Sequence, residues 1–142
     1  MRSRSLSFLL NSRYKFLRKI YFFYNIYIRN FKFLKKSSQF NEDIFLQKYF
    51  KNYNKGKYLD LGCFHPVRDN NTYQLYKKNW NGINIDLNPL TIELFNFSRP
   101  KDINLNTALS RKSGIKNFYY FGEFSPLNTL DSNHLKFLKK NF

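Results

Sequence analysis

Hydrophobic positions along the chain change their spacing near residue 37, and this change divides it into two parts. Before that point, apolar residues recur at intervals of three and four, which predicts one helix or a pair of helices. The positions of this apolar stripe are Phe16, Leu17, Ile20, Phe23, Tyr24, Tyr27, Ile28, Phe31 and Leu34. After it, short apolar runs alternate with helical patterns, as they do in α/β domains. We therefore expect a helical arm over residues 1–36 and an α/β domain over residues 37–142.

The clearest pattern in the domain runs from Tyr58 to Pro89 and predicts strand, loop, helix and strand in that order. The first apolar run ends at Gly62 and the second ends at Asp86, which lies 24 positions further on. In a nucleotide-binding βαβ unit, a glycine follows the first strand and a carboxylate about 20 residues later binds the ribose hydroxyls. The spacing fits such a unit, and it equally fits a βαβ unit that binds nothing.

The loop after the first strand differs from a dinucleotide fingerprint. Gly62 is its only glycine, and His65-Pro66 stand where the pattern would have another. This argues against a pyrophosphate bound at the helix N-terminus. It favours a nucleoside ligand without phosphate, of which S-adenosylmethionine is the commonest.

Further elements are predicted on either side of this unit. We expect a helix from Glu42 to Phe50 that is capped by Asn41, with Phe40 and Phe45 forming a hydrophobic staple. Asn88-Pro89 has the sequence of a helix start, with proline in the first turn, and Arg99-Pro100 would end that helix. The remaining expected elements are a strand over residues 103–109, an antiparallel strand over 115–121 and a helix over 132–140 capped by Asp131.

Positive charge is concentrated in the arm. The chain carries 25 Lys and Arg against 9 Asp and Glu, yet residues 1–40 hold ten basic residues and no acidic one. The longest uncharged run in the arm, Ile20 to Ile28, has nine residues, whereas a membrane span needs about 20. The arm could pack its apolar stripe on the domain or on a second subunit, or lie on an anionic membrane surface. Nucleic acid is less favoured as its partner, because no recognised binding module is present.

Cysteine and histidine are too few for a disulfide or a zinc site. Cys63 is the only cysteine, and His65 and His134 are the only histidines. No internal disulfide can form, which fits a reducing compartment such as the cytoplasm, with membrane association through the arm as an addition. We expect no bound metal.

Several ordered blocks of sequence extend the βαβ pattern. They are D-L-G-C-F-H-P (60–66), D-N-N-T-Y (69–73), N-W-N-G-I-N-I-D-L-N-P (79–89), and the flanking S-Q-F-N-E-D (38–43), R-P-K-D-I-N (99–104) and A-L-S (108–110). Together they resemble the FkbM family of S-adenosylmethionine-dependent methyltransferases over roughly residues 37–130. The resemblance implies a Rossmann-like class I methyltransferase fold and O-methylation of a sugar, glycan or secondary metabolite.

The resemblance also implies roles for individual residues. Asp86 would accept the ribose hydroxyls, and Asp60 would organise the glycine loop and the amino group of the cofactor. The implied cofactor-binding set is Asp60, Gly62, Cys63, Phe64, Asn71, Thr72, Asp86, Leu87, Thr107 and Ala108. The lead-in segment adds Gln39 and Glu42 as weaker candidates. His65 is the catalytic candidate because imidazole titrates near neutral pH, and a loop-shaping role is its alternative.

The chain departs from the family pattern after residue 130. The family continues with a fourth strand that ends in an acidic I-D-V-E-G-like motif, and residues 131–142 contain none. The expected domain is therefore incomplete at its C-terminus, as a truncated chain whose own activity is in question or as one completed by another chain. The alternative function is a non-enzymatic basic module that binds anionic membrane or nucleic acid through residues 1–40.

Overall fold

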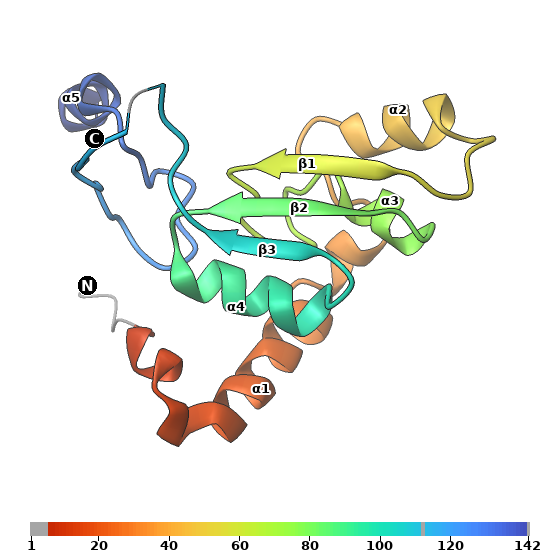
Figure 1. The fold of residues 1–142 in the computed structure, drawn as a ribbon, viewed down its shortest axis with the longest axis horizontal. Helices are drawn as coiled ribbons and strands as arrows, with labels where there is room; N and C mark the ends of the chain where they lie inside the picture. The colour runs from red at the N-terminus through yellow and green to blue at the C-terminus, as the bar shows by residue number, and fades with distance from the viewer. Residues whose placement is uncertain (1–5, 112, 142) are drawn as a thin grey trace.

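A parallel β-sheet of three strands forms the centre of the domain (Figure 1). The computed structural model describes residues 6–111 and 113–141. Strands β1 (Lys57–Leu61), β2 (Asn81–Asp86) and β3 (Ile103–Asn106) lie in the order β1-β2-β3, and β2 pairs in parallel with both neighbours. The fold is mixed α/β, which confirms the expectation at that level.

Helices precede, connect and follow the strands. They are α1 (Lys15–Phe23), α2 (Glu42–Tyr49), α3 (Tyr73–Lys77), α4 (Pro89–Ser98) and α5 (Ser132–Asn141). The arm adds 3-10 turns at Ser7–Leu10, Ser12–Tyr14 and Phe31–Leu34, and a π-helical segment at Tyr24–Arg29. The predicted positions of α2, α4 and α5 are confirmed to within a residue or two, and α3 is the helix expected between the first two strands.

Helix α4 begins and ends where its sequence indicates. The Asn88 side chain accepts a hydrogen bond from the Leu90 N–H at 2.9 Å, and Pro89 occupies the first turn, where its missing N–H has no partner to lose. The helix ends at Arg99. Its buried face supplies Leu90, Leu94 and Phe95 to the core, so α4 is the main layer packed against the sheet.

The arm packs on the side of α4 that faces away from the sheet (Figure 1). Leu9, Phe22 and Ile26 form one core cluster with Val67, Leu90 and Leu94. Of the predicted stripe, Leu34 packs against this cluster and the other members are exposed. Of the two packing alternatives, the one in which the stripe packs on the domain is therefore wrong for all members but Leu34, and packing on a second subunit is not tested. The arm is apolar on more than one side, and the π-helical segment Tyr24–Arg29 alters the helical phase.

The two faces of the sheet differ sharply in polarity. Asp102 accepts hydrogen bonds from Tyr58 Oη (2.5 Å), Asn84 Nδ2 (2.9 Å) and the Gly82 N–H (2.9 Å), on the face that α4 covers. The opposite face carries four exposed aliphatic residues, Leu59, Leu61, Ile103 and Leu105. Parallel sheets are normally covered on both faces. This sheet is covered by helices on its polar face.

The start of α2 differs from the prediction. Asn41 has a φ of +71° and its side chain makes no capping bond, while Ser38 Oγ accepts from the Asp43 N–H at 3.2 Å. The Asp43 carboxylate in turn accepts from the Ser37 N–H at 2.7 Å. Phe40 and Phe45 are both exposed and form no staple. The Ser–Asp exchange replaces the expected cap because it pulls residues 37 and 38 over the end of the helix.

The C-terminal segment holds less strand than predicted. Strand β3 ends at Asn106 instead of residue 109, and residues 115–121 form no strand. A single antiparallel bridge joins Tyr119 to Thr129. Ile115 is fully exposed, so the alternating pattern there has no neighbouring surface on which to pack. Asp131 caps α5 as expected, accepting from the Asn133 N–H at 2.8 Å.

Candidate functional site

A cleft of about 700 Å³ lies at the carboxyl ends of the strands. Its walls come from the loops that follow β1 and β2 and from the segment over residues 118–131. Of the sequence-predicted cofactor residues, Gly62, Phe64, Asp86, Leu87 and Thr107 line it. The two residues that define the βαβ spacing, Gly62 and Asp86, therefore face one shared space, as the sequence predicted.

Backbone donors hold the Asp86 carboxylate in place at the end of β2. Its Oδ2 accepts from the Phe64 N–H at 3.0 Å, and its Oδ1 accepts from the Asn88 N–H at 2.8 Å. Burial raises the pKa of this carboxyl group, while the two N–H donors act in the opposite direction. Each oxygen keeps a second lone pair, so the carboxylate can still accept one hydroxyl hydrogen on each oxygen.

Gly62 makes the sharp turn that opens the cleft. Its φ is +69°, and its N–H bonds the Ile85 carbonyl at 2.9 Å. A Cβ placed on Gly62 would have no atom within 4 Å, so the glycine leaves open space beside the cleft. The turn requires a residue that tolerates the left-handed region, and the open space permits a ligand to approach the backbone.

Replacing Gly62 by alanine is expected to lower the free energy of unfolding by about 1–2 kcal/mol, because an L-residue with a Cβ is strained at this φ. Gly62→Asn should cost less, since asparagine visits the left-handed region more readily. Urea denaturation of both variants measures the difference. Equal stability of Gly62→Ala and the unaltered chain would contradict the strained turn.

The loop between β1 and α3 is held in a constrained conformation. Phe64 has a φ of +56° and Asp69 a φ of +49°, and both line the cleft. Positive φ is uncommon for a residue as large as phenylalanine. The Phe64 carbonyl accepts from Thr91 Oγ1 at 3.1 Å, which ties the loop to α4. Such strain persists where surrounding contacts enforce it, and it clusters at ligand-binding loops.

Asp60 and Thr72 lie behind this loop and do not line the cleft. Asp60 Oδ2 accepts from Thr72 Oγ1 at 2.8 Å and from Asn70 Nδ2 at 3.1 Å. Asp60 thus joins β1 to the loop and to the start of α3. The contacts support the loop-organising part of its expected role and give it no direct access to a ligand in the cleft.

The other predicted residues are also distributed unevenly. The Cys63 thiol is buried against Ile92 and Phe95, and burial raises its pKa. Asn71 and Ala108 are exposed but do not belong to the cleft wall. Gln39 lines the cleft and Glu42 does not. Of the two candidates in the segment over residues 38–43, only Gln39 therefore reaches the site.

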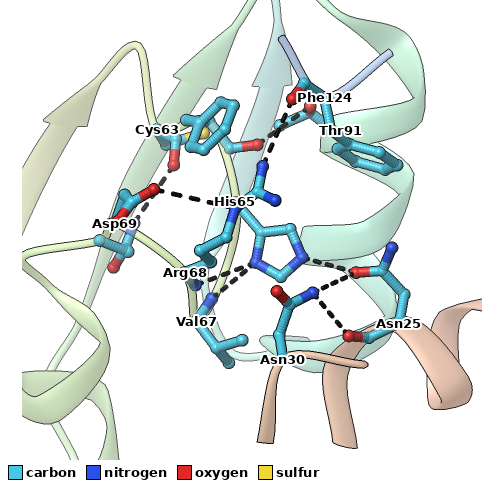
Figure 2. A network of polar contacts seen from close by, with 11 residues as sticks. Asn25, Asn30, Cys63, His65, Val67, Arg68, Asp69, Thr91 and Phe124 are labelled. Carbon is cyan, nitrogen blue, oxygen red and sulfur yellow. Dashed lines mark hydrogen bonds and ion pairs between the residues drawn. The ribbon is translucent and has the colours of Figure 1, made fainter. Parts of the chain in front are cut away.

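His65 is part of a buried polar network that joins the loop to the arm (Figure 2). Its Nε2 lies 2.7 Å from Asn25 Oδ1, and its Nδ1 accepts from the Val67 N–H at 3.2 Å and the Arg68 N–H at 3.0 Å. Burial lowers the pKa of His65 to about 3. The ring is therefore neutral with its hydrogen on Nε2, and it has no free nitrogen. These contacts match the loop-shaping alternative, and the ring does not line the cleft.

Sequence reasoning missed the acidic character of the cleft. Asp69, Glu123 and Asp131 line it together with Asp86, which are four of the nine acidic residues of the chain. None of the described residues that line the cleft is lysine or arginine. In so basic a chain, the small number of carboxylates was a signal that could have been followed. The arrangement favours a cationic ligand.

Metal ligands do not gather in this part of the chain, since the described residues contain no group of three or more His, Cys, Asp or Glu that could hold an ion. Comparison with protein-family models, with curated proteins and with solved structures gave no match. The geometry and charge of the cleft therefore carry the functional argument.

Proposed function

We propose that this chain is a methyltransferase of the Rossmann-like class I type that binds S-adenosylmethionine in the cleft. The reaction we propose is O-methylation of a sugar, glycan or secondary metabolite. The observation that carries the proposal is the convergence of Gly62 and Asp86 on one cleft of about 700 Å³ at the carboxyl ends of parallel strands. In open α/β sheets, ligands bind outside those strand ends. Pockets of about 300–1,000 Å³ accommodate ligands of cofactor size.

The charge of the cleft supports this cofactor over a nucleotide. S-adenosylmethionine carries a sulfonium and an ammonium cation and no phosphate. Asp69 is paired with Arg68 at 3.8 Å, and the remaining cleft carboxylates, Asp86, Glu123 and Asp131, favour such cations, whereas they would repel the phosphates of a nucleotide. In this arrangement Asp86 accepts the ribose hydroxyls, and Leu87 and Thr107 lie beside the base.

Methyl transfer requires mainly that the methyl donor and the acceptor oxygen be aligned. The acceptor oxygen attacks the methyl carbon in line with the carbon–sulfur bond, which breaks with its electron pair left on sulfur. The hydroxyl proton passes to a base or to water. Holding donor and acceptor in this geometry supplies much of the rate. The constrained loop over residues 62–69 and the fixed Asp86 carboxylate provide such a rigid support for the donor.

Asp86→Asn is expected to weaken S-adenosylmethionine binding roughly 10- to 100-fold, the usual effect of losing charge-assisted hydrogen bonds. An amide has one acceptor oxygen, so it cannot serve both backbone donors and both hydroxyls. Equilibrium dialysis with radiolabelled cofactor measures the change, and circular dichroism checks that the variant is folded.

Glu93→Gln is the matched control. Glu93 pairs with Arg18 at 3.3 Å and lies outside the cleft, so the variant removes one negative charge without touching the site. Its affinity should equal that of the unaltered chain. No measurable binding by the unaltered chain, or equal losses in both variants, would overturn the proposal.

A further inference from the structure

The arm presents an apolar stripe to its surroundings and not to the domain. Phe16, Ile20, Phe23, Tyr27 and Phe31 follow one another at helical spacing and are 74, 51, 54, 44 and 66 % exposed. The rings of Phe23 and Tyr27 lie 5.1 Å apart, so the stripe is continuous at its centre. Exposed apolar surface of this extent on a helix marks an interaction site more often than chance exposure.

The other side of the same helix is anchored. Phe22 and Ile26 are buried in the cluster that includes Leu90 and Leu94 of α4. The arm therefore lies on the outside of α4 (Figure 1), and the stripe residues stay exposed there. Because these contacts already fix the helix, presenting the stripe to a partner requires little further ordering.

Positive charge surrounds the stripe. Seven basic residues of the described arm are exposed, namely Arg13, Lys15, Lys19, Arg29, Lys32, Lys35 and Lys36. Residues 1–40 contain no acidic residue that could neutralise them. Arg18 differs from them, because it pairs with Glu93 of α4. The stripe and the exposed cations thus share one segment.

We infer that this segment, residues 13–36, docks the protein on the surface of an anionic lipid bilayer. The aromatic and aliphatic side chains enter the boundary between head groups and acyl chains, and the lysines and arginines lie at the anionic head groups. The contact is made at the surface, since no helix in the described ranges has the length and apolar character needed to cross a bilayer.

Charge and side-chain chemistry favour this partner over the alternatives. A second copy of the chain has the same net charge of +16, so pairing two arms would bring cations together. A nucleic acid offers charge complementarity and can stack bases on the aromatic rings, but it provides no apolar phase for the exposed Leu17, Ile20 and Ile28 of the same segment. An anionic bilayer complements both the charge and the apolar surface.

The full chain is tested by flotation with vesicles of phosphatidylcholine alone and with vesicles that also contain the anionic lipid phosphatidylserine. Binding should be at least about tenfold stronger to the anionic vesicles and weaker in high salt. Phe23→Ser with Tyr27→Ser should reduce it about tenfold or more, as should Lys15→Glu with Lys19→Glu.

The chain offers matched controls for both changes. Phe45 and Tyr49 on α2 form another exposed aromatic pair four residues apart, so Phe45→Ser with Tyr49→Ser removes the same two kinds of side chain elsewhere. Lys139→Glu with Lys140→Glu makes the same charge change on α5, where both lysines are exposed. Both controls should bind anionic vesicles as the unaltered chain does.

Three results would overturn the inference. The first is no binding to anionic vesicles. The second is an equal loss in either arm variant and its control, which would mean that binding does not depend on the apolar stripe or on the cations of the arm. The third is self-association without lipid that the Phe23/Tyr27 variant abolishes, measured by analytical ultracentrifugation, which would identify a second copy as the partner of the stripe.

Discussion

Replacing Arg99 by alanine is expected to lower the free energy of unfolding by about 3 kcal/mol, because a buried acceptor left unpaired costs about 1–3 kcal/mol and a large-to-small change in the interior costs about 2–5 kcal/mol. Arg99 is fully buried. Its Nη1 donates to Thr72 Oγ1 at 2.8 Å, and its Nη2 donates to Asn70 Oδ1 at 2.7 Å and to the Pro66 carbonyl. Alanine would remove the Arg99 donor from the Pro66 carbonyl and open a cavity, while Asn70 Oδ1 would keep only its bonds from Thr72.

Lysine at position 99 should not restore the lost free energy of unfolding. The guanidinium lies over the rings of Tyr73, Tyr76 and Phe95, with centroids 5.6, 5.4 and 4.9 Å from Cζ. A lysine ammonium lacks the planar fork that bonds two residues while it stacks on rings. Arg99→Lys is therefore expected to lose most of the same stability, measured by urea denaturation.

Arg111 provides the control for the arginine-to-lysine change, because it is exposed. Arg111→Lys should leave the free energy of unfolding within about 0.5 kcal/mol of the unaltered value. A similar small change for Arg99→Lys would show that the positive charge, and not the fork of donors, is what the buried site needs.

Acidification is expected to destabilise the protein through His65. Burial lowers the pKa of the folded imidazole to about 3, whereas an unfolded histidine has a pKa of about 6.5. Between pH 6.5 and pH 3, the imidazole is protonated in the unfolded state and neutral in the folded state. The free energy of unfolding therefore falls as the pH falls below 6.5. From pH 7.5 to pH 5, His65 should remove about 2 kcal/mol.

The comparison with His65→Gln isolates this effect. Asp86 acts in the opposite direction, because its raised folded pKa makes the folded state take up a proton first as the pH falls. Subtracting the pH profile of the variant removes that contribution, provided that both proteins unfold cooperatively. Parallel profiles for the two proteins would contradict the buried neutral imidazole.

Nuclear magnetic resonance gives an independent measurement on the folded state. The chain has two histidines, so a His134→Gln background leaves one imidazole to observe. The His65 ring signals should stay those of the neutral form down to about pH 4, given its folded pKa of about 3. A midpoint near pH 6.5 would show that the ring is accessible to solvent.

The residues that the sequence placed correctly are those whose positions follow from local rules. Gly62 and Asp86 end neighbouring parallel strands, so their convergence needs only the βαβ topology. Asn88 and Pro89 start α4 because capping and proline geometry act within one turn. The end of β2 depends on one strand pairing and the start of α4 on a few neighbouring residues, so both could be predicted from the local sequence.

Other site features depended on contacts between distant segments. Glu123 and Asp131 reach the cleft only because residues 118–131 return across the strand ends. His65 pairs with Asn25, 40 positions earlier in the chain, which turned a titratable loop residue into a buried structural one. No local pattern around His65 could reveal that partner.

By itself, the sequence determined the order of the three parallel strands and of helices α2 to α5, the cleft residues Gly62 and Asp86, and the concentration of cations in the arm, because spacing and composition are properties of the chain. Only the tertiary structure decided which face of the arm is buried and which carboxylates meet in the cleft. Apolar residues occur on several sides of the arm, and packing against α4 selects Phe22 and Ile26 over the more regular stripe. Burial is a property of the folded neighbourhood, so the side chains that remain for partners are known only once the packing is known.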